Sequence, residues 1–193
     1  MISRCSKIMT NWLIDSGVID KKDYELYFYA SHSLLISILP LFLTLIIGVF
    51  MRLAINGLLI IIPFMLVRKY SGGYHASSPK TCLTFSILLL VTFIWLSDNI
   101  KGSDLNIFLF FSNLILMIIS PVDSQNYRLD EKQKKQYRRI VFRLLVILDI
   151  VIIGLYIFQM YTAVICISLG ITLSALLQIP YIGTKIIERL QVS

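Results

Sequence analysis

Charged residues are scarce in this chain, and they lie in short stretches between long apolar runs. Asp, Glu, Lys and Arg make up only 15% of the 193 residues, whereas 57% are hydrophobic and the mean hydropathy is +0.80. Soluble globular domains carry roughly 25% charged residues, so the composition excludes that class. We predict an integral membrane protein whose solvent is the lipid bilayer.

Cysteine is also sparse, and several familiar motifs are missing. Cys5, Cys82 and Cys166 show no CxxC spacing, so we expect neither a disulfide framework nor a thiolate metal site. No phosphate-binding motif and no repeat between the halves occurs. The net charge of +7 does not indicate nucleic-acid binding, because the basic residues do not form one continuous face. We predict no metal, no other cofactor and no nucleic-acid partner.

Six apolar segments approach the roughly 20 helical residues that cross a hydrocarbon core about 30 Å thick. They are residues 33–51, 53–67, 81–96, 105–119, 140–158 and 162–180. Before them, Ile2, Met9 and Trp12 recur at near-helical spacing among polar residues, a pattern typical of an amphipathic interfacial helix that Gly17 would end.

The predicted fold is an all-α, polytopic membrane helix bundle in one domain, residues 1–193. Residues 1–32 form cytoplasmic or interfacial helices, residues 33–183 form a six-span bundle, and the polar stretch 121–139 is a loop. Fifteen of the 18 Lys and Arg residues fall in the N-terminal segment, the second and fourth connections and the tail. Basic residues are retained on the cytoplasmic side, so we predict six crossings with both termini in the cytoplasm. A five-span arrangement would break this alternation.

Hydropathy does not explain residues 68–82, RKYSGGYHASSPKTC. His75 and Cys82 are seven residues apart, which on one helix means about 10.5 Å along the axis, too far for proton transfer. Proline is favoured at the first position of a helix, with serine before it as the N-cap. We therefore predict that Ser78 caps a helix that starts at Pro79 and holds Cys82 in its first turn.

This placement favours a reactive thiol. A helix N-terminus and nearby cations favour the thiolate form of cysteine. The nearby cations are Arg68, Lys69 and Lys80. Gly72 and Gly73 allow the chain to fold back, so that His75 can take the proton of Cys82 and the thiolate can attack a peptide carbonyl. Spacing alone leaves open that the two residues have no catalytic role.

The segment from Arg68 to Cys82, between the second and third apolar segments, resembles the signature of the AgrB family. These are accessory gene regulator membrane endopeptidases of Gram-positive bacteria. The chain length, the amphipathic start and the basic stretch that follows Pro121 also fit, so the resemblance covers essentially the whole chain. It implies that His75 is the catalytic histidine, that Cys82 is the nucleophile, and that Arg68 and Gly73 support them.

The resemblance also implies a substrate and a product. The family removes the C-terminal part of a small AgrD-like precursor and forms a cyclic thiolactone or lactone, a quorum-sensing pheromone. It further implies a homodimer in the bacterial plasma membrane. The basic run 132–139 fixes the topology in this interpretation, and it also suits acidic residues in the tail of the precursor.

Two other functions stay open at this stage. Asp149 lies inside the fifth apolar segment, where an acid is a functional candidate by default, with Arg143 or a facing polar helix as its partner. A small transporter or peptide exporter without peptidase activity would use Asp149 along its path, although no internal repeat supports it. The third hypothesis is a structural membrane subunit without chemistry of its own.

Overall fold

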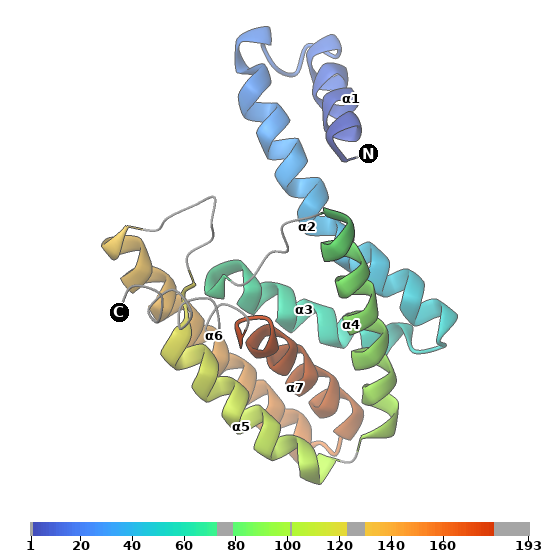
Figure 1. Cartoon of the computed structure of the whole chain (residues 1–193), viewed down its shortest axis with the longest axis vertical. Coiled ribbons are helices and arrows are strands. Elements are labelled where there is room, and N and C mark those ends of the chain that lie inside the picture. The colour runs from blue at the N-terminus through green and yellow to red at the C-terminus, as the bar shows by residue number, and fades with distance from the viewer. Residues whose placement is uncertain (1, 73–78, 101, 123–129, 180–193) are drawn as a thin grey trace, which may run out of the picture. The chain divides into compact units, whose positions relative to one another are not determined.

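The computed structural model describes residues 2–72, 79–100, 102–122 and 130–179, and every regular element in these ranges is a helix (Figure 1). The all-α prediction is confirmed for this part of the chain. The helices belong to two compact units, residues 1–43 and 44–193.

The first unit begins with a helix whose apolar side chains are exposed. In α1 (Ile2–Asp15) the side chains of Ile8 and Trp12 are 70% and 63% exposed, whereas Ser6 and Thr10 are fully buried. The sequence predicts an amphipathic helix over this segment, and the structure confirms the helix. An apolar stripe that faces outward is typical of a helix that lies against lipid.

α1 ends in a glycine turn. The Val18 amide donates to the Leu13 carbonyl at 3.1 Å, and Gly17 has a φ of +68°, an angle that glycine adopts without steric cost. The chain continues through η1 (Lys21–Asp23) into α2 (Tyr24–Phe50). The first part of α2 runs antiparallel to α1 (Figure 1). Gly17 ends the first helix where the sequence predicts.

α2 starts earlier than the first predicted span. It joins the aromatic segment that begins at Tyr24 to the apolar segment 33–51 as one helix of 27 residues. Together with η1 it forms the run Lys21–Phe50, which is long and apolar enough to cross a membrane. The rings of Tyr24 and Phe28 stack with their centroids 6.1 Å apart, and such aromatic side chains are enriched at membrane interfaces.

The other five predicted spans also form helices, in the predicted order. They are α3 (Ala54–Ser71), α4 (Pro79–Asn99), α5 (Gly102–Ile119), α6 (Glu131–Ile157) and α7 (Tyr161–Leu176). By length and composition α3 and α6 can cross a membrane, as Lys21–Phe50 can. The apolar stretches Thr84–Asn99, Asn106–Ile119 and Tyr161–Leu176 are shorter.

The prediction of a loop over residues 121–139 was wrong for its second half, because α6 begins at Glu131. Asp130 and Gln133 form a capping box, in which the Asp130 amide donates to Gln133 Oε1 at 3.1 Å. Lys, Gln and Arg are good helix formers, so a polar sequence is no obstacle once the helix has been capped. The basic run is therefore the start of α6.

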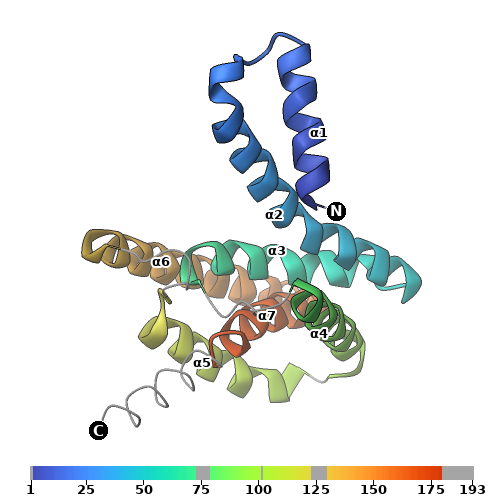
Figure 2. The same ribbon diagram turned by 45° about the horizontal axis from the view of Figure 1, so that its top comes forward.

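α7 lies at the centre of the second unit. It contacts α3, α4, α5 and α6, and Figures 1 and 2 show these four helices around it. Eleven of its 16 residues are buried, as expected for a helix that is apolar on every side. Two clusters of buried side chains meet at α7. One joins it to α3 and α4 through Ile60, Phe93, Ile94, Cys166 and Leu169, and the other joins it to α3, α5 and α6 through Val67, Leu116, Leu145, Ile167 and Ile171.

The outer surface of the second unit is apolar as well. On α6, Leu145 and Ile152 are buried, whereas Ile147, Ile150 and Ile153 are more than half exposed. A soluble monomer rarely exposes an apolar surface that extends along a helix in this way. The outward face therefore matches lipid rather than water.

A close approach of α7 to α3 depends on Gly170. A Cβ at this position would overlap the Ile60 carbonyl oxygen and lie 2.7 Å from Pro63 Cγ. We expect Gly170→Ala to lower the free energy of unfolding by about 1–3 kcal/mol, the usual cost of overpacking a filled core. The measurement is the midpoint of thermal unfolding of the purified chain in detergent.

Gly154→Ala is the matched control, because Gly154 lies in α6 with no atom within 4 Å of an added Cβ. Alanine stabilises a helix interior relative to glycine by about 0.5–1 kcal/mol, so this midpoint should not fall. Equal midpoints for the two variants would contradict the tight contact at Gly170.

Candidate functional site

The helix that carries Cys82 starts where the sequence predicts. α4 begins at Pro79, so Cys82 is its fourth residue and lies in the first helical turn. The first amides of a helix have no acceptor within it. Pro79 has no N–H, which leaves the amides of Lys80 and Thr81 at this helix start. Such amides stabilise negative charge.

Three of the predicted site residues, Gly73, His75 and Ser78, lie outside the described residues. The cap at Ser78 and the pairing of His75 with Cys82 therefore stay predictions. Lys80 lies in the first turn of α4, and Arg68 lies half-buried in the last turn of α3.

The end of α3 fixes where the segment that contains His75 begins. The Gly72 amide donates to the Arg68 carbonyl at 3.2 Å and closes the last turn. Gly72 has a φ of +71°, and a Cβ on it would overlap the carbonyl oxygen of Val122. The sequence predicts that Gly72 allows the chain to fold back, and its positive φ is an angle that residues with a side chain rarely adopt.

Five residues join the ends of three helices, and we call them the polar junction: Ser71, Gly72, Ser120, Val122 and Gln178. The Val122 amide donates to the Ser71 carbonyl at 2.9 Å. Gln178 Nε2 donates to the same carbonyl at 3.2 Å and to Ser120 Oγ at 2.8 Å. The junction thus holds together the ends of α3, α5 and α7.

Sequence reasoning missed the polar junction. Its members are separated by 107 residues between Ser71 and Gln178, and by 58 between Ser120 and Gln178. The available signal was Gln178 itself, a polar residue inside the segment predicted as the sixth span.

The start of α6 lies at the same end of the unit as the polar junction. The rings of Tyr70 in α3 and Tyr137 in α6 meet edge to face, with their centroids 5.9 Å apart. Arg138 Nη2 donates to the Met117 carbonyl in α5 at 3.4 Å. The basic start of α6 is therefore close to the residues that precede the His75 segment.

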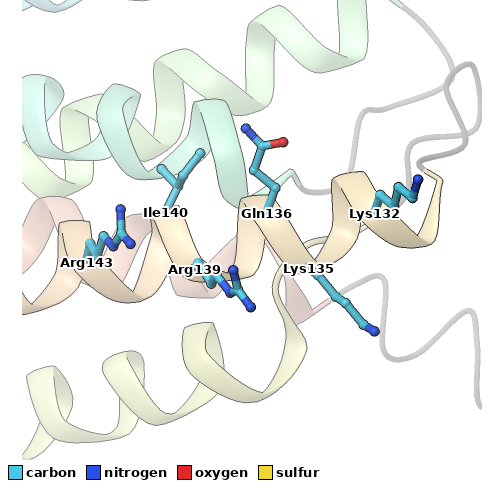
Figure 3. A pocket seen from close by; sticks show the side chains of 6 residues that line it. All are labelled: Lys132, Lys135, Gln136, Arg139, Ile140 and Arg143. Atoms are coloured by element: carbon cyan, nitrogen blue, oxygen red, sulfur yellow. The ribbon is translucent and has the colours of Figure 1, made fainter.

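A groove of about 590 Å³ runs along this part of α6 (Figure 3). The described residues that line it all belong to α6, and four of them are cationic. They are Lys132, Lys135, Gln136, Arg139, Ile140 and Arg143. None of the described residues that line the groove is acidic, so the charge of these side chains suits an anionic group.

Asp149 has a partner on a facing helix. Asn113 Nδ2 of α5 lies 3.0 Å from both carboxylate oxygens of Asp149 in α6. The sequence analysis allows either Arg143 or a residue on a facing polar helix as the partner of Asp149. The structure shows the second, because Asn113 lies on α5. This bond joins α5 to α6, so Asp149 contributes to the packing of these two helices.

The remaining cysteines and the second histidine lie in α1, α2 and α7. Cys166 is fully buried in α7, as expected for a small hydrophobic residue, and Cys5 is exposed on α1. The His32 ring in α2 lies against Phe28, with the centroids 6.1 Å apart.

The apolar helices and the outward apolar faces define a helical membrane protein, in which α4 carries Cys82 in its first turn. The accessory gene regulator B (AgrB) family model matches residues 6–180, and the chain belongs to this family. Membership links the chain to processing of an accessory gene regulator peptide, and thus to an AgrD-type peptide and a membrane.

Two relatives come from Clostridium perfringens. An AgrB-like protein of strain SM101 is 25% identical over 97% of this chain and 95% of its own length. AgrB-like protein 2 of strain 13 is 24% identical over 76% of this chain and 73% of its own length. No solved structure matches the chain.

Substitution of Gly72 tests the polar junction. Gly72→Ala adds a positive-φ strain of about 1–2 kcal/mol and a clash with Val122 O, which should separate α3 from the residues after α5. We expect a lower midpoint of thermal unfolding in detergent and faster tryptic cleavage after Lys69.

Gly17→Ala is the matched control, since Gly17 has a φ of +68° but no atom within 4 Å of an added Cβ. It carries the backbone strain without the clash, so cleavage after Lys69 should keep its normal rate. Normal cleavage in Gly72→Ala would show that the contact with Val122 is dispensable.

Proposed function

We propose that the whole chain is a single membrane cysteine endopeptidase domain, which cleaves the C-terminal part from an AgrD-like precursor through an acyl-thioester on Cys82. The observation that carries the proposal is the start of α4 at Pro79. It supports a nucleophile in the first turn of a helix, and the family match covers the same segment.

The first chemical step uses His75 as a general base. His75 takes the proton of the Cys82 thiol, and the thiolate attacks the scissile carbonyl. The tetrahedral oxyanion is stabilised by amides of the first turn of α4, where Lys80 and Thr81 have no acceptor within the helix. The protonated His75 then gives its proton to the leaving amine, and the C–N bond breaks.

The second step closes the ring. An internal Cys or Ser of the bound precursor fragment attacks the thioester carbonyl on Cys82. His75 takes the proton of that Cys or Ser, and a new thioester or ester forms within the peptide as the bond to Cys82 Sγ breaks. His75 then returns the proton to the Cys82 thiolate. Water competes for the same carbonyl, so a site at the membrane interface that excludes water favours the cyclic product.

We propose six membrane spans with both termini in the cytoplasm, so that the polar junction and the start of α6 face inward. The six apolar helices support the count. The cations of the α6 groove support the orientation, because positive residues are retained on the cytoplasmic side.

The proposal assigns two further roles. The exposed apolar stripe of α1 lies in the inner interface, beside lipid. The α6 groove contacts acidic residues in the tail of the precursor, because the described residues that line it include four cations and no acid. The proposed assembly is a homodimer, for which the exposed apolar faces of the helices are available.

Substitution of the proposed catalytic pair tests the function directly. We expect Cys82→Ala to abolish processing of a co-expressed cognate precursor, and His75→Ala to slow it by about 10²–10⁴-fold, as loss of a general base does. Mass spectrometry of the released peptide measures the rate, and a hydroxylamine-sensitive adduct reports the thioester.

Cys5→Ala is the control for a cysteine exposed elsewhere, and Cys166→Ala for one buried in the core. Both variants should process the precursor. Cleavage that survives in Cys82→Ala would overturn the peptidase proposal.

Labelling of single cysteines tests the topology. In a chain whose own cysteines are replaced by alanine, Asn99→Cys lies at the end of α4 and Lys132→Cys lies at the start of α6, and both positions are exposed. A membrane-impermeant maleimide should label Asn99→Cys in intact cells, because charged reagents do not cross the hydrocarbon core.

The same reagent should label Lys132→Cys only after the cells are permeabilised. Labelling of both positions from the same side of the membrane would exclude the proposed arrangement.

A further inference from the structure

Gln178 is fully buried, although it lies beyond the end of α7. Glutamine is mostly found exposed, so complete burial of its amide calls for a specific set of partners. Nε2 lies 3.2 Å from the Ser71 carbonyl oxygen and 2.8 Å from Ser120 Oγ. One side chain thus binds the last residue of α3 and the residue that follows α5.

The direction of these bonds is fixed by chemistry. The Ser71 carbonyl can only accept a hydrogen bond, so the amide nitrogen of Gln178 must face it. The opposite atom, Oε1, is buried too, and none of the residues described in the structure donates to it. Among the described residues, the Gln178 side chain is therefore held only through Nε2, by the Ser71 carbonyl and Ser120 Oγ.

Ser71 and Gly72 are the residues from which the His75 segment departs. The Ser71 carbonyl receives two donors, Gln178 Nε2 and the Val122 amide. Gly72 is pressed against Val122 so closely that no side chain fits. The end of α3, where the chain leaves the helix, is thus held by Val122, which follows α5, and by Gln178, which follows α7.

We propose that Gln178 is a positioning residue for the reaction: through Ser71 and Ser120 it fixes the base of the segment that carries His75, and so sets the approach of His75 to Cys82. The inference rests on the proposed function, since it requires that His75 acts on Cys82. An apolar side chain of similar size would fill the same volume without fixing the direction in which the chain leaves α3.

The test follows the reactivity of Cys82 across a pH range. Cys5→Ala and Cys166→Ala leave Cys82 as the sole thiol, and membranes that contain the full chain are alkylated with iodoacetamide. Only the thiolate reacts, and a neighbouring imidazolium maintains it at low pH. Gln178→Met, similar in volume, should lower the rate at about pH 6 roughly tenfold and leave the rate at about pH 10 within roughly twofold.

A merely structural defect would change the rate at both pH values, since a distorted helix start alters access to the sulfur at any pH. Ser174→Ala is the matched control. Ser174 is also fully buried in α7 and donates to the Phe64 and Gly170 carbonyls at 3.4 and 3.2 Å, and neither acceptor belongs to the polar junction. Its pH profile should match that of the parent.

Ser120 provides a second and smaller change. Ser120→Ala removes the 2.8 Å partner of Gln178 Nε2 and should lower the rate at low pH in the same direction, whereas Ser120→Thr retains the hydroxyl and should restore the rate. This pair decides the matter if Gln178→Met is not recovered as folded protein.

His75→Ala separates the inference from the function on which it rests. If His75→Ala lowers the rate at low pH and Gln178→Met does not, Gln178 has no positioning role and the peptidase proposal stands. If His75→Ala leaves the profile unchanged, the Cys–His pair is wrong and the inference falls with it. Matching losses in His75→Ala and Gln178→Met support both.

Discussion

The burial of α7 on every side is the constraint on which the second unit depends. Lipid tails are as apolar as leucine, so apolar burial alone does little to bring helices together in a membrane. Close packing and hydrogen bonds must do so instead. Gly170 lets α7 approach the backbone of α3 at Ile60, and Ser174 Oγ reaches the Phe64 carbonyl at 3.4 Å. Small residues on α7 thus allow the close packing and the hydrogen bond that hold it against α3.

Polar bonds between helices supplement this packing at three levels. Asn56 Nδ2 at the start of α3 donates to Ser97 Oγ near the end of α4 at 3.0 Å. Asn113 bonds Asp149 midway along α5 and α6. The polar junction closes the other end, where carbonyls of the last helical turn have no partner within the helix. Each bond satisfies a group that lipid cannot, and together they fix which helices are neighbours.

Sequence patterns predicted the helices better than their ends or their contacts. Hydropathy located all six apolar segments, and Pro79 predicted the start of α4, because proline acts locally. Hydropathy failed at Glu131, since a capped helix of Lys, Gln and Arg has no apolar signal. It failed again at the polar junction, because Ser71, Ser120 and Gln178 are far apart in the sequence and only the folded unit brings them together.

On the proposed function, the two reacting side chains depend on different parts of the fold. The position of Cys82 follows from Pro79, a local feature of the sequence that starts α4. The segment that carries His75 follows Gly72, and the Val122 amide and Gln178 Nε2 both donate to the carbonyl of the preceding residue, Ser71. Proton transfer needs donor and acceptor within about 2.6–3.2 Å, or one water between them. The rate of such a reaction is therefore sensitive to residues that touch neither the substrate nor the catalytic pair. On this proposal the packing of α7, which positions Gln178, affects the rate of proton transfer.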